Sequence, residues 1–148
     1  MRFRAHHVAI SVRDLAATAS FYEALGFRLC LQWEARDRSL TIAHFAGSGG
    51  FFLEAFHWAA NADRERLDMT MGNDLPVAGV KHLALAVDDV RAAREELAAK
   101  GFTDATPVQR GRTEMDFFFV RDPDGMWVEI AQDDRDLDPG RVVYLQES

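Results

Sequence analysis

The chain has 148 residues, of which 48% are hydrophobic, and a formal net charge of −7. This length supports a single domain, 1–148, with one well-filled core, and the spread of acidic residues excludes nucleic acid as a partner because phosphate binding needs a basic face. No apolar run approaches the ~18 residues of a membrane span, and the N-terminus lacks a signal-peptide core, so we expect no membrane partner. The single cysteine, Cys30, excludes an internal disulfide, which fits the cytoplasm as the expected location.

The first predicted elements are a strand and a helix. Residues 7–12 alternate between large aliphatic and small or polar side chains, which is typical of a half-buried strand. Asp14 can cap a helix that runs to about Leu25, and Gly26 stands where a helix end favours a left-handed residue. Three strand-like runs follow, near residues 27–34, 39–45 and 50–58.

The second half of the chain repeats this order. We expect a strand at 82–87, a cap at Asp88 or Asp89, a helix to about Lys100 and a stop at Gly101. Strands are then predicted near 102–109, 115–121 and 126–131, with a turn at 122–125 before the last. Residues 59–78 are predicted to form a polar connector. The fold class is therefore α+β, with two βαβββ modules at about 1–72 and 73–148.

A shift of seventy-five residues aligns the two halves. Eight identities fall within positions 7–27, where about one or two are expected by chance. In the same register, His7 falls on His82 and Glu54 falls on Glu129. Each half thus holds a histidine and, forty-seven residues later, a glutamate.

Side-chain alternation places these four residues away from the helix-packed core. The histidines share their strand faces with small residues: Ala9, Ser11, Ala84 and Ala86. The glutamates share theirs with Phe52, Phe56, Trp127 and Ala131. Small residues on one wall and aromatic residues on another describe a pocket.

Other interpretations of the same residues remain open. A lone histidine at a strand start is usually a surface residue, and gene duplication alone repeats residues without making a site. A glutamate within the apolar stretch around Glu54 is costly unless it is paired. A divalent cation bound by two carboxylates and two imidazoles would pair all four.

The remaining candidates are weaker. His6 has the opposite strand parity to His7, so we expect a surface or core histidine. His44 and His57 have no counterpart in the other half, so we expect structural or pocket-lining roles for them. Cys30 is expected to be an inert buried thiol. Arg110 and Arg112 flank Gly111 and form either an anion clamp or a solvated surface pair.

Together with the segments FYEALGF and RDPDGMWVEI, the four residues resemble the vicinal oxygen chelate superfamily, and most closely its glyoxalase I (lactoylglutathione lyase) branch. The resemblance implies paired modules that form a cupped mixed sheet, as in the glyoxalase, bleomycin-resistance and dihydroxybiphenyl dioxygenase proteins. It also implies one divalent ion (Zn, Ni, Co, Mn or Fe) held by His7, Glu54, His82 and Glu129, and a homodimer.

The resemblance further implies a reaction. Bound oxygens of a small substrate are polarised by the ion, and a nearby carboxylate moves a proton between neighbouring carbons. Glu129 is the first candidate for this catalytic base and Glu54 the second. Glyoxalase I commonly has an Arg four residues after the first His and an Asn four residues after the first Glu, where this chain has Ser11 and Trp58.

We therefore expect a vicinally oxygenated small molecule that is not linked to glutathione. Phe52, Phe56 and Trp58 suit an apolar or aromatic substrate. Two alternatives remain. One is an extradiol-type iron dioxygenase using His7, His82 and Glu129. The other is a metal-free resistance protein of the same fold that binds an antibiotic or another small molecule.

Overall fold

The computed structural model describes residues 4–60, 70, 75–76, 78–138, 140 and 142–145. The chain divides into two compact units, Met1–Pro76 with Asp122–Asp124, and Val77–Arg121 with Gly125–Ser148. Each unit holds one four-stranded sheet with the predicted βαβββ order. The connector predicted at 59–78 lies mostly outside the described residues, so the module boundary near residue 72 stays a prediction.

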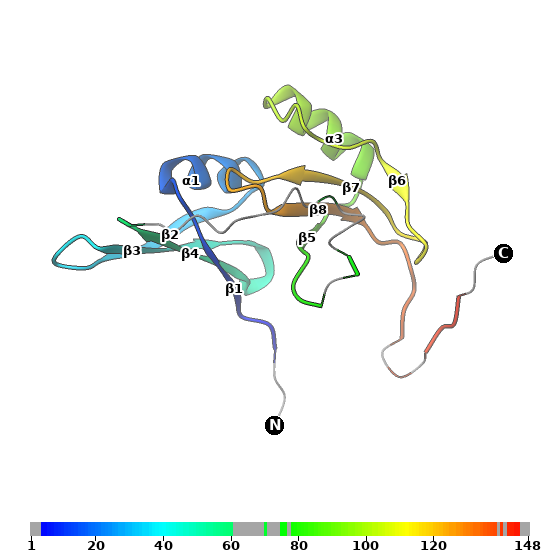
Figure 1. The fold of residues 1–148 in the computed structure, drawn as a ribbon. Helices are drawn as coiled ribbons and strands as arrows, with labels where there is room; N and C mark the ends of the chain where they lie inside the picture. Colours follow the sequence, from blue (N-terminus) through cyan, green and yellow to red (C-terminus); the bar gives the residue numbers. More distant parts are fainter. Residues whose placement is uncertain are drawn as a thin grey trace. The chain divides into compact units, whose positions relative to one another are not determined.

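The first unit begins with strand β1 (His7–Ser11) and helix α1 (Leu15–Ala24). Three further strands and a short 3-10 helix follow: β2 (Arg28–Glu34), β3 (Leu40–Ala46), η1 (Ser48–Gly50) and β4 (Phe52–Trp58). The sheet order is β1-β4-β3-β2, with β1 and β4 parallel and the other neighbours antiparallel. Helix α1 lies over one face of this sheet (Figure 1).

The second unit repeats the pattern with β5 (His82–Ala86) and α3 (Val90–Ala99). Its remaining strands are β6 (Gln109–Arg110), β7 (Asp116–Arg121) and β8 (Trp127–Gln132). The order β5-β8-β7-β6 matches that of the first sheet, and β5 runs parallel to β8. Helix α3 covers one face of this sheet in the same way (Figure 1).

Helices α1 and α3 begin and end where the sequence indicates. The Asp14 carboxylate accepts a hydrogen bond from the backbone N–H of Ala17, and Asp89 does the same for two backbone N–H groups of α3. Asp89, rather than Asp88, is therefore the cap. Gly26 and Gly101 follow the helix ends with φ of 93° and 95°, the left-handed region that glycine adopts without strain.

The strand predicted at 102–109 is wrong in extent, because only Gln109–Arg110 form a strand. The segment before it contains Pro107, which has no N–H to donate to a ladder. Thr106 instead bonds to Phe119 of β7 through both its backbone N–H and its side-chain hydroxyl. This irregular attachment replaces the regular edge strand that the sequence predicts.

Each sheet has one core-facing side. In the first unit, Phe45 and Leu53 are fully buried, as is Tyr22 of α1. In the second, Phe118 and Val128 are fully buried, and Leu97 of α3 is nearly so. Among the residues described, no helix combines the length and apolar character needed to cross a membrane. The predicted histidine and glutamate positions are on the other face of each sheet, as the strand registers show.

Candidate functional site: two histidine–glutamate pairs

In the first unit, three neighbouring strands present polar side chains on the face away from the core. The parallel register aligns Ala9 of β1 with Glu54 of β4, which places His7 one pleat along on the same face. The antiparallel register aligns His44 of β3 with Glu54 directly. Glu54 therefore lies between two histidines from adjacent strands.

The two oxygens of Glu54 face different rings. Oε1 lies 2.9 Å from Nε2 of His44, and Oε2 lies 3.7 Å from Nε2 of His7. The Glu54 side chain is 18% exposed, whereas that of His7 is 43% exposed. Since an ionised carboxylate only accepts hydrogen bonds, His44 is the donor in the shorter contact.

In the second unit, the equivalent pair is closer and more buried. Nε2 of His82 lies 2.7 Å from Oε2 of Glu129, whose side chain is only 8% exposed. The register repeats that of the first unit, with Ala84 opposite Glu129 and Trp127 opposite His82. The His82 ring also meets Phe119 at 5.5 Å between ring centroids, with an interplanar angle of 70°.

Residues around the two pairs differ in a way that the repeat alone does not predict. Phe119 stands at the second-unit position that His44 occupies in the first, and it is aligned with Glu129. Lys81 stands at the position of His6. His6 Nδ1 lies 2.9 Å from His7 Nδ1, whereas His82 Nδ1 is buried and has no hydrogen-bond partner among the described residues.

Two of these neighbours make contacts that the comparison of the two halves does not predict. His6 is exposed, as expected for a surface histidine, and it precedes β1. Its Nδ1 contacts that of His7, and its ring lies 5.4 Å from that of Phe52. His44 is hydrogen-bonded to Glu54, which agrees with the structural role expected as one of its two alternatives. The contact between His44 and Glu54 follows from the register of the β3–β4 hairpin, because a turn centred near Gly49 brings residues 44 and 54 opposite each other.

The donor atoms suit a divalent metal ion. In each unit an imidazole Nε2 faces a carboxylate oxygen, and two atoms that bind one ion at about 2.0–2.2 Å lie roughly 3 Å apart. The observed separations of 2.7 and 3.7 Å lie on either side of that value. No group of three or more His, Cys, Asp or Glu is arranged as a metal site within the described ranges. The structure thus shows two pairs, and the predicted set of four stays a prediction.

The predicted substrate-binding residues of the first unit share the face of Glu54. Phe52 and Phe56 are half-buried on β4 and are aligned with His7 and Ser11 of β1. Trp58 follows at the end of β4 and is 45% exposed. This face therefore combines one carboxylate with aromatic side chains on either side of it, as the alternation predicts.

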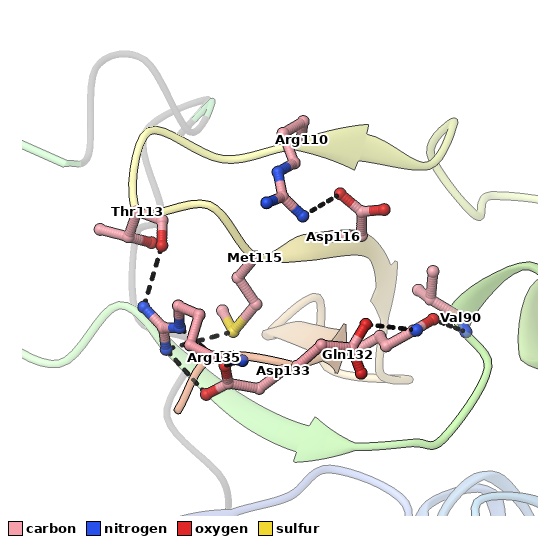
Figure 2. Close-up of polar contacts among 9 residues, drawn as sticks. Val90, Arg110, Thr113, Met115, Asp116, Gln132, Asp133 and Arg135 are labelled. Carbon is pink, nitrogen blue, oxygen red and sulfur yellow. Dashed lines mark hydrogen bonds and ion pairs between the residues drawn. The ribbon is translucent and has the colours of Figure 1, made fainter. Parts of the chain in front are cut away.

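The two candidate arginines belong to the second unit: Arg110 ends β6, and Arg112 lies in the connection to β7. Arg110 forms an ion pair with Asp116 at 3.1 Å, as Figure 2 shows, and Arg112 is exposed in the following turn. Because Arg110 is already paired with the Asp116 carboxylate, a substrate anion would have to compete with Asp116 for the Arg110 guanidinium. Their role as an anion clamp stays a prediction.

Cys30 is exposed, so the expectation of a buried thiol is wrong. It lies on β2, whose residues are all exposed, and its Sγ donates to the carbonyl of His44 at 3.2 Å. The apolar neighbours in its sequence suggest burial, but β2 is an edge strand of the first sheet.

The turn Asp122–Asp124 belongs to the first unit and contacts two of its residues. The hydroxyl of the fully buried Tyr22 donates to Asp122 at 3.2 Å, and Arg13 Nε donates to Asp124 at 2.8 Å. Burial, with a further contribution from the Asp122 carboxylate, holds the pKa of Tyr22 far above its ordinary value. This cluster supports the fold, and neither His–Glu pair includes any of its members.

Comparisons with known proteins agree with the fold. Residues 4–130 match the family described as "Glyoxalase/Bleomycin resistance protein/Dioxygenase superfamily". A probable lactoylglutathione lyase of Vibrio parahaemolyticus is 30% identical over 135 residues, covering 85% of this chain and 88% of that protein. YwbC of Bacillus subtilis is 31% identical over 140 residues, covering 89% and 99%. The crystal structure of SMU.1112c superposes with a TM-score of 0.73 at 28% identity, covering 87% and 98%. These likenesses confirm the predicted fold of two βαβββ modules.

Proposed function

Because the chain belongs to the Glyoxalase/Bleomycin resistance protein/Dioxygenase superfamily, we propose that it is a divalent-metal-dependent lyase or isomerase of glyoxalase type. It moves a proton next to a carbonyl in a small, vicinally oxygenated substrate. The observation that carries the proposal is the repeated His–Glu pair on adjacent parallel strands, with the imidazole Nε2 facing the carboxylate in both units. Likeness to a probable lactoylglutathione lyase supports the same reaction class.

His7, Glu54, His82 and Glu129 are proposed to hold one ion together, within one chain or between two chains of a homodimer. When bound, such an ion polarises a substrate carbonyl and stabilises the negative charge that develops on its oxygen. The burial of Glu129 explains why this set of residues favours a bound cation. Glu129 is nearly buried, is aligned with Phe119 and has only His82 as a partner among the described residues, so a positive charge would offset its desolvation.

Glu129 is also the proposed base. It accepts a proton from the carbon next to the substrate carbonyl and returns it to the neighbouring carbon, so that bonds and protons balance without an oxidant. The surrounding apolar residues exclude water, which strengthens the electrostatic interactions of this carboxylate. Glu54 is the less suitable base because its Oε1 is hydrogen-bonded to His44, which is not one of the proposed ligands, whereas the one partner of Glu129 among the described residues is the proposed ligand His82.

The substrate is proposed to be apolar and free of glutathione. Ser11 and Trp58 occupy the two positions where glyoxalase I enzymes commonly hold that cofactor, and neither carries a charge. Phe52 and Phe56 lie on the same face as Glu54, which favours a substrate with an aromatic or aliphatic group beside its two oxygens.

Hydrogen exchange into two simple ketones tests this proposal, whatever the natural substrate is. In D2O with one added divalent metal, the protein should exchange the hydrogen next to the carbonyl of 2-hydroxyacetophenone, and do so faster than for hydroxyacetone. Glu129→Gln should bind the metal yet lose about 10²-fold or more of the exchange rate. Full exchange by this variant would refute the assignment of the base.

The same preparation separates the alternatives. Equal exchange rates in air and under anaerobic conditions support the proposed reaction. Oxygen uptake that depends on iron would replace it with a dioxygenase. Absence of any bound ion after dialysis against Zn²⁺, Ni²⁺ or Co²⁺ would leave the binding protein as the function.

A further inference from the structure

The most informative difference between the two units is the neighbour that faces each glutamate across the antiparallel strand pair. In the first unit that neighbour is His44, whose Nε2 lies 2.9 Å from Oε1 of Glu54. In the second it is Phe119, aligned with Glu129 and buried. A phenyl ring has no N–H to donate, so Glu54 has a histidine neighbour in addition to its proposed co-ligand His7, whereas Glu129 has only its proposed co-ligand His82 among the described residues.

A hydrogen bond to one carboxylate oxygen restricts how the group can bind or move. His44 holds Oε1, which leaves Oε2 of Glu54 directed toward Nε2 of His7. The His44 side chain is 28% exposed and the Glu54 side chain 18% exposed, so water competes only partly for this contact. Partners of this kind orient metal-binding carboxylates and commonly change metal affinity when they are removed.

We propose that His44 is a positioning residue that fixes Glu54 as a static, single-oxygen metal ligand, so that proton transfer falls to Glu129. This inference rests on the proposed function, because it assigns different tasks to its two glutamates. Glu129 has no donor at the Phe119 position and can change its hydrogen bonding as a proton arrives and leaves. The two glutamates thus have different tasks: both bind the ion, but Glu54 serves only as a ligand and Glu129 also moves the proton.

Binding of Co²⁺ alone tests the role of His44 without any substrate. His44→Phe gives Glu54 the same neighbour that Glu129 has, and we expect the Co²⁺ dissociation constant to rise about 10–100-fold. The visible absorption bands of bound Co²⁺ should also shift, because the carboxylate is free to bind through both oxygens. His44→Gln, which keeps an N–H donor, should recover most of the affinity and the wild-type spectrum.

His57→Phe is the matched control. His57 lies on the same sheet but has the opposite parity to Glu54 on β4, so this variant should bind Co²⁺ like the wild type. A double-variant cycle distinguishes positioning from general loss of structure. If His44 acts through Glu54, His44→Phe should change the affinity less than about two-fold when Glu54→Gln is already present.

Two results would overturn the assignment. One is an unchanged affinity and spectrum in His44→Phe, and the other is a full effect of His44→Phe in the Glu54→Gln background. In both cases the proposed function survives if the wild type binds Co²⁺ and exchange still requires Glu129. If the wild type binds none of the divalent ions, the proposed function and this inference both fail.

Discussion

Replacing His82 by alanine removes the partner that the fold gives to a nearly buried carboxylate. The Glu129 side chain is 8% exposed, and its Oε2 lies 2.7 Å from Nε2 of His82. Breaking a buried pair by removing one member costs about 3–5 kcal/mol, because the other charge stays desolvated. We expect the free energy of unfolding of the metal-free protein to fall by about 3 kcal/mol or more in His82→Ala.

The matched change in the first unit, His7→Ala, should cost only about 0–1 kcal/mol. His7 is 43% exposed and lies 3.7 Å from Oε2 of Glu54, which keeps its hydrogen bond with His44. Urea unfolding with a chelator present, followed by circular dichroism at neutral pH, measures both variants. Adding Glu129→Gln to His82→Ala should restore part of the stability by removing the buried charge. Equal losses in the two single variants, within about 0.5 kcal/mol, would refute this reasoning.

Two further predictions concern titrating groups. Tyr22→Phe should lower the free energy of unfolding at pH 7 by about 1–2 kcal/mol through the lost bond to Asp122. The folded-state pKa of Tyr22 is raised by burial and by Asp122, so the stability of the wild type falls as pH rises above the ordinary tyrosine pKa of about 10. Urea unfolding at pH 11 should therefore show a smaller difference in the free energy of unfolding between the wild type and Tyr22→Phe than at pH 7. Hydrogen bonds from Arg135, drawn in Figure 2, hold the pKa of Asp133 at about 2. In Arg135→Ala, carboxyl-carbon NMR should show that pKa rising toward its usual value of about 3.9, and an unchanged pKa would contradict the contact.

Sequence alone predicts the parts of this molecule that depend on local chemistry. The caps at Asp14 and Asp89 and the left-handed Gly26 and Gly101 mark the helices because each satisfies helix-end geometry within a few residues. Alternation on β1 and β5 places both histidines on the face away from the core because side chains in a strand change sides at every residue.

Contacts between strands are harder to predict from the repeat. Comparing the halves favours residues that recur, and it gives His44 little weight because its counterpart is Phe119. The strand expected at 102–109 does not form over most of its length because Pro107 cannot donate to a ladder. Alternation places a side chain on a face of its own sheet and carries no information on the distance between two sheets. The convergence of both pairs on one ion therefore stays a prediction.

Metal content tests that convergence most directly. Protein purified without added ions, saturated with Zn²⁺ and dialysed, should retain about one ion per chain by elemental analysis. His7→Ala and His82→Ala, each altering a different unit, should both lose it. Retention of the ion by either variant, or two ions per chain in the wild type, would contradict a single site built from both His–Glu pairs.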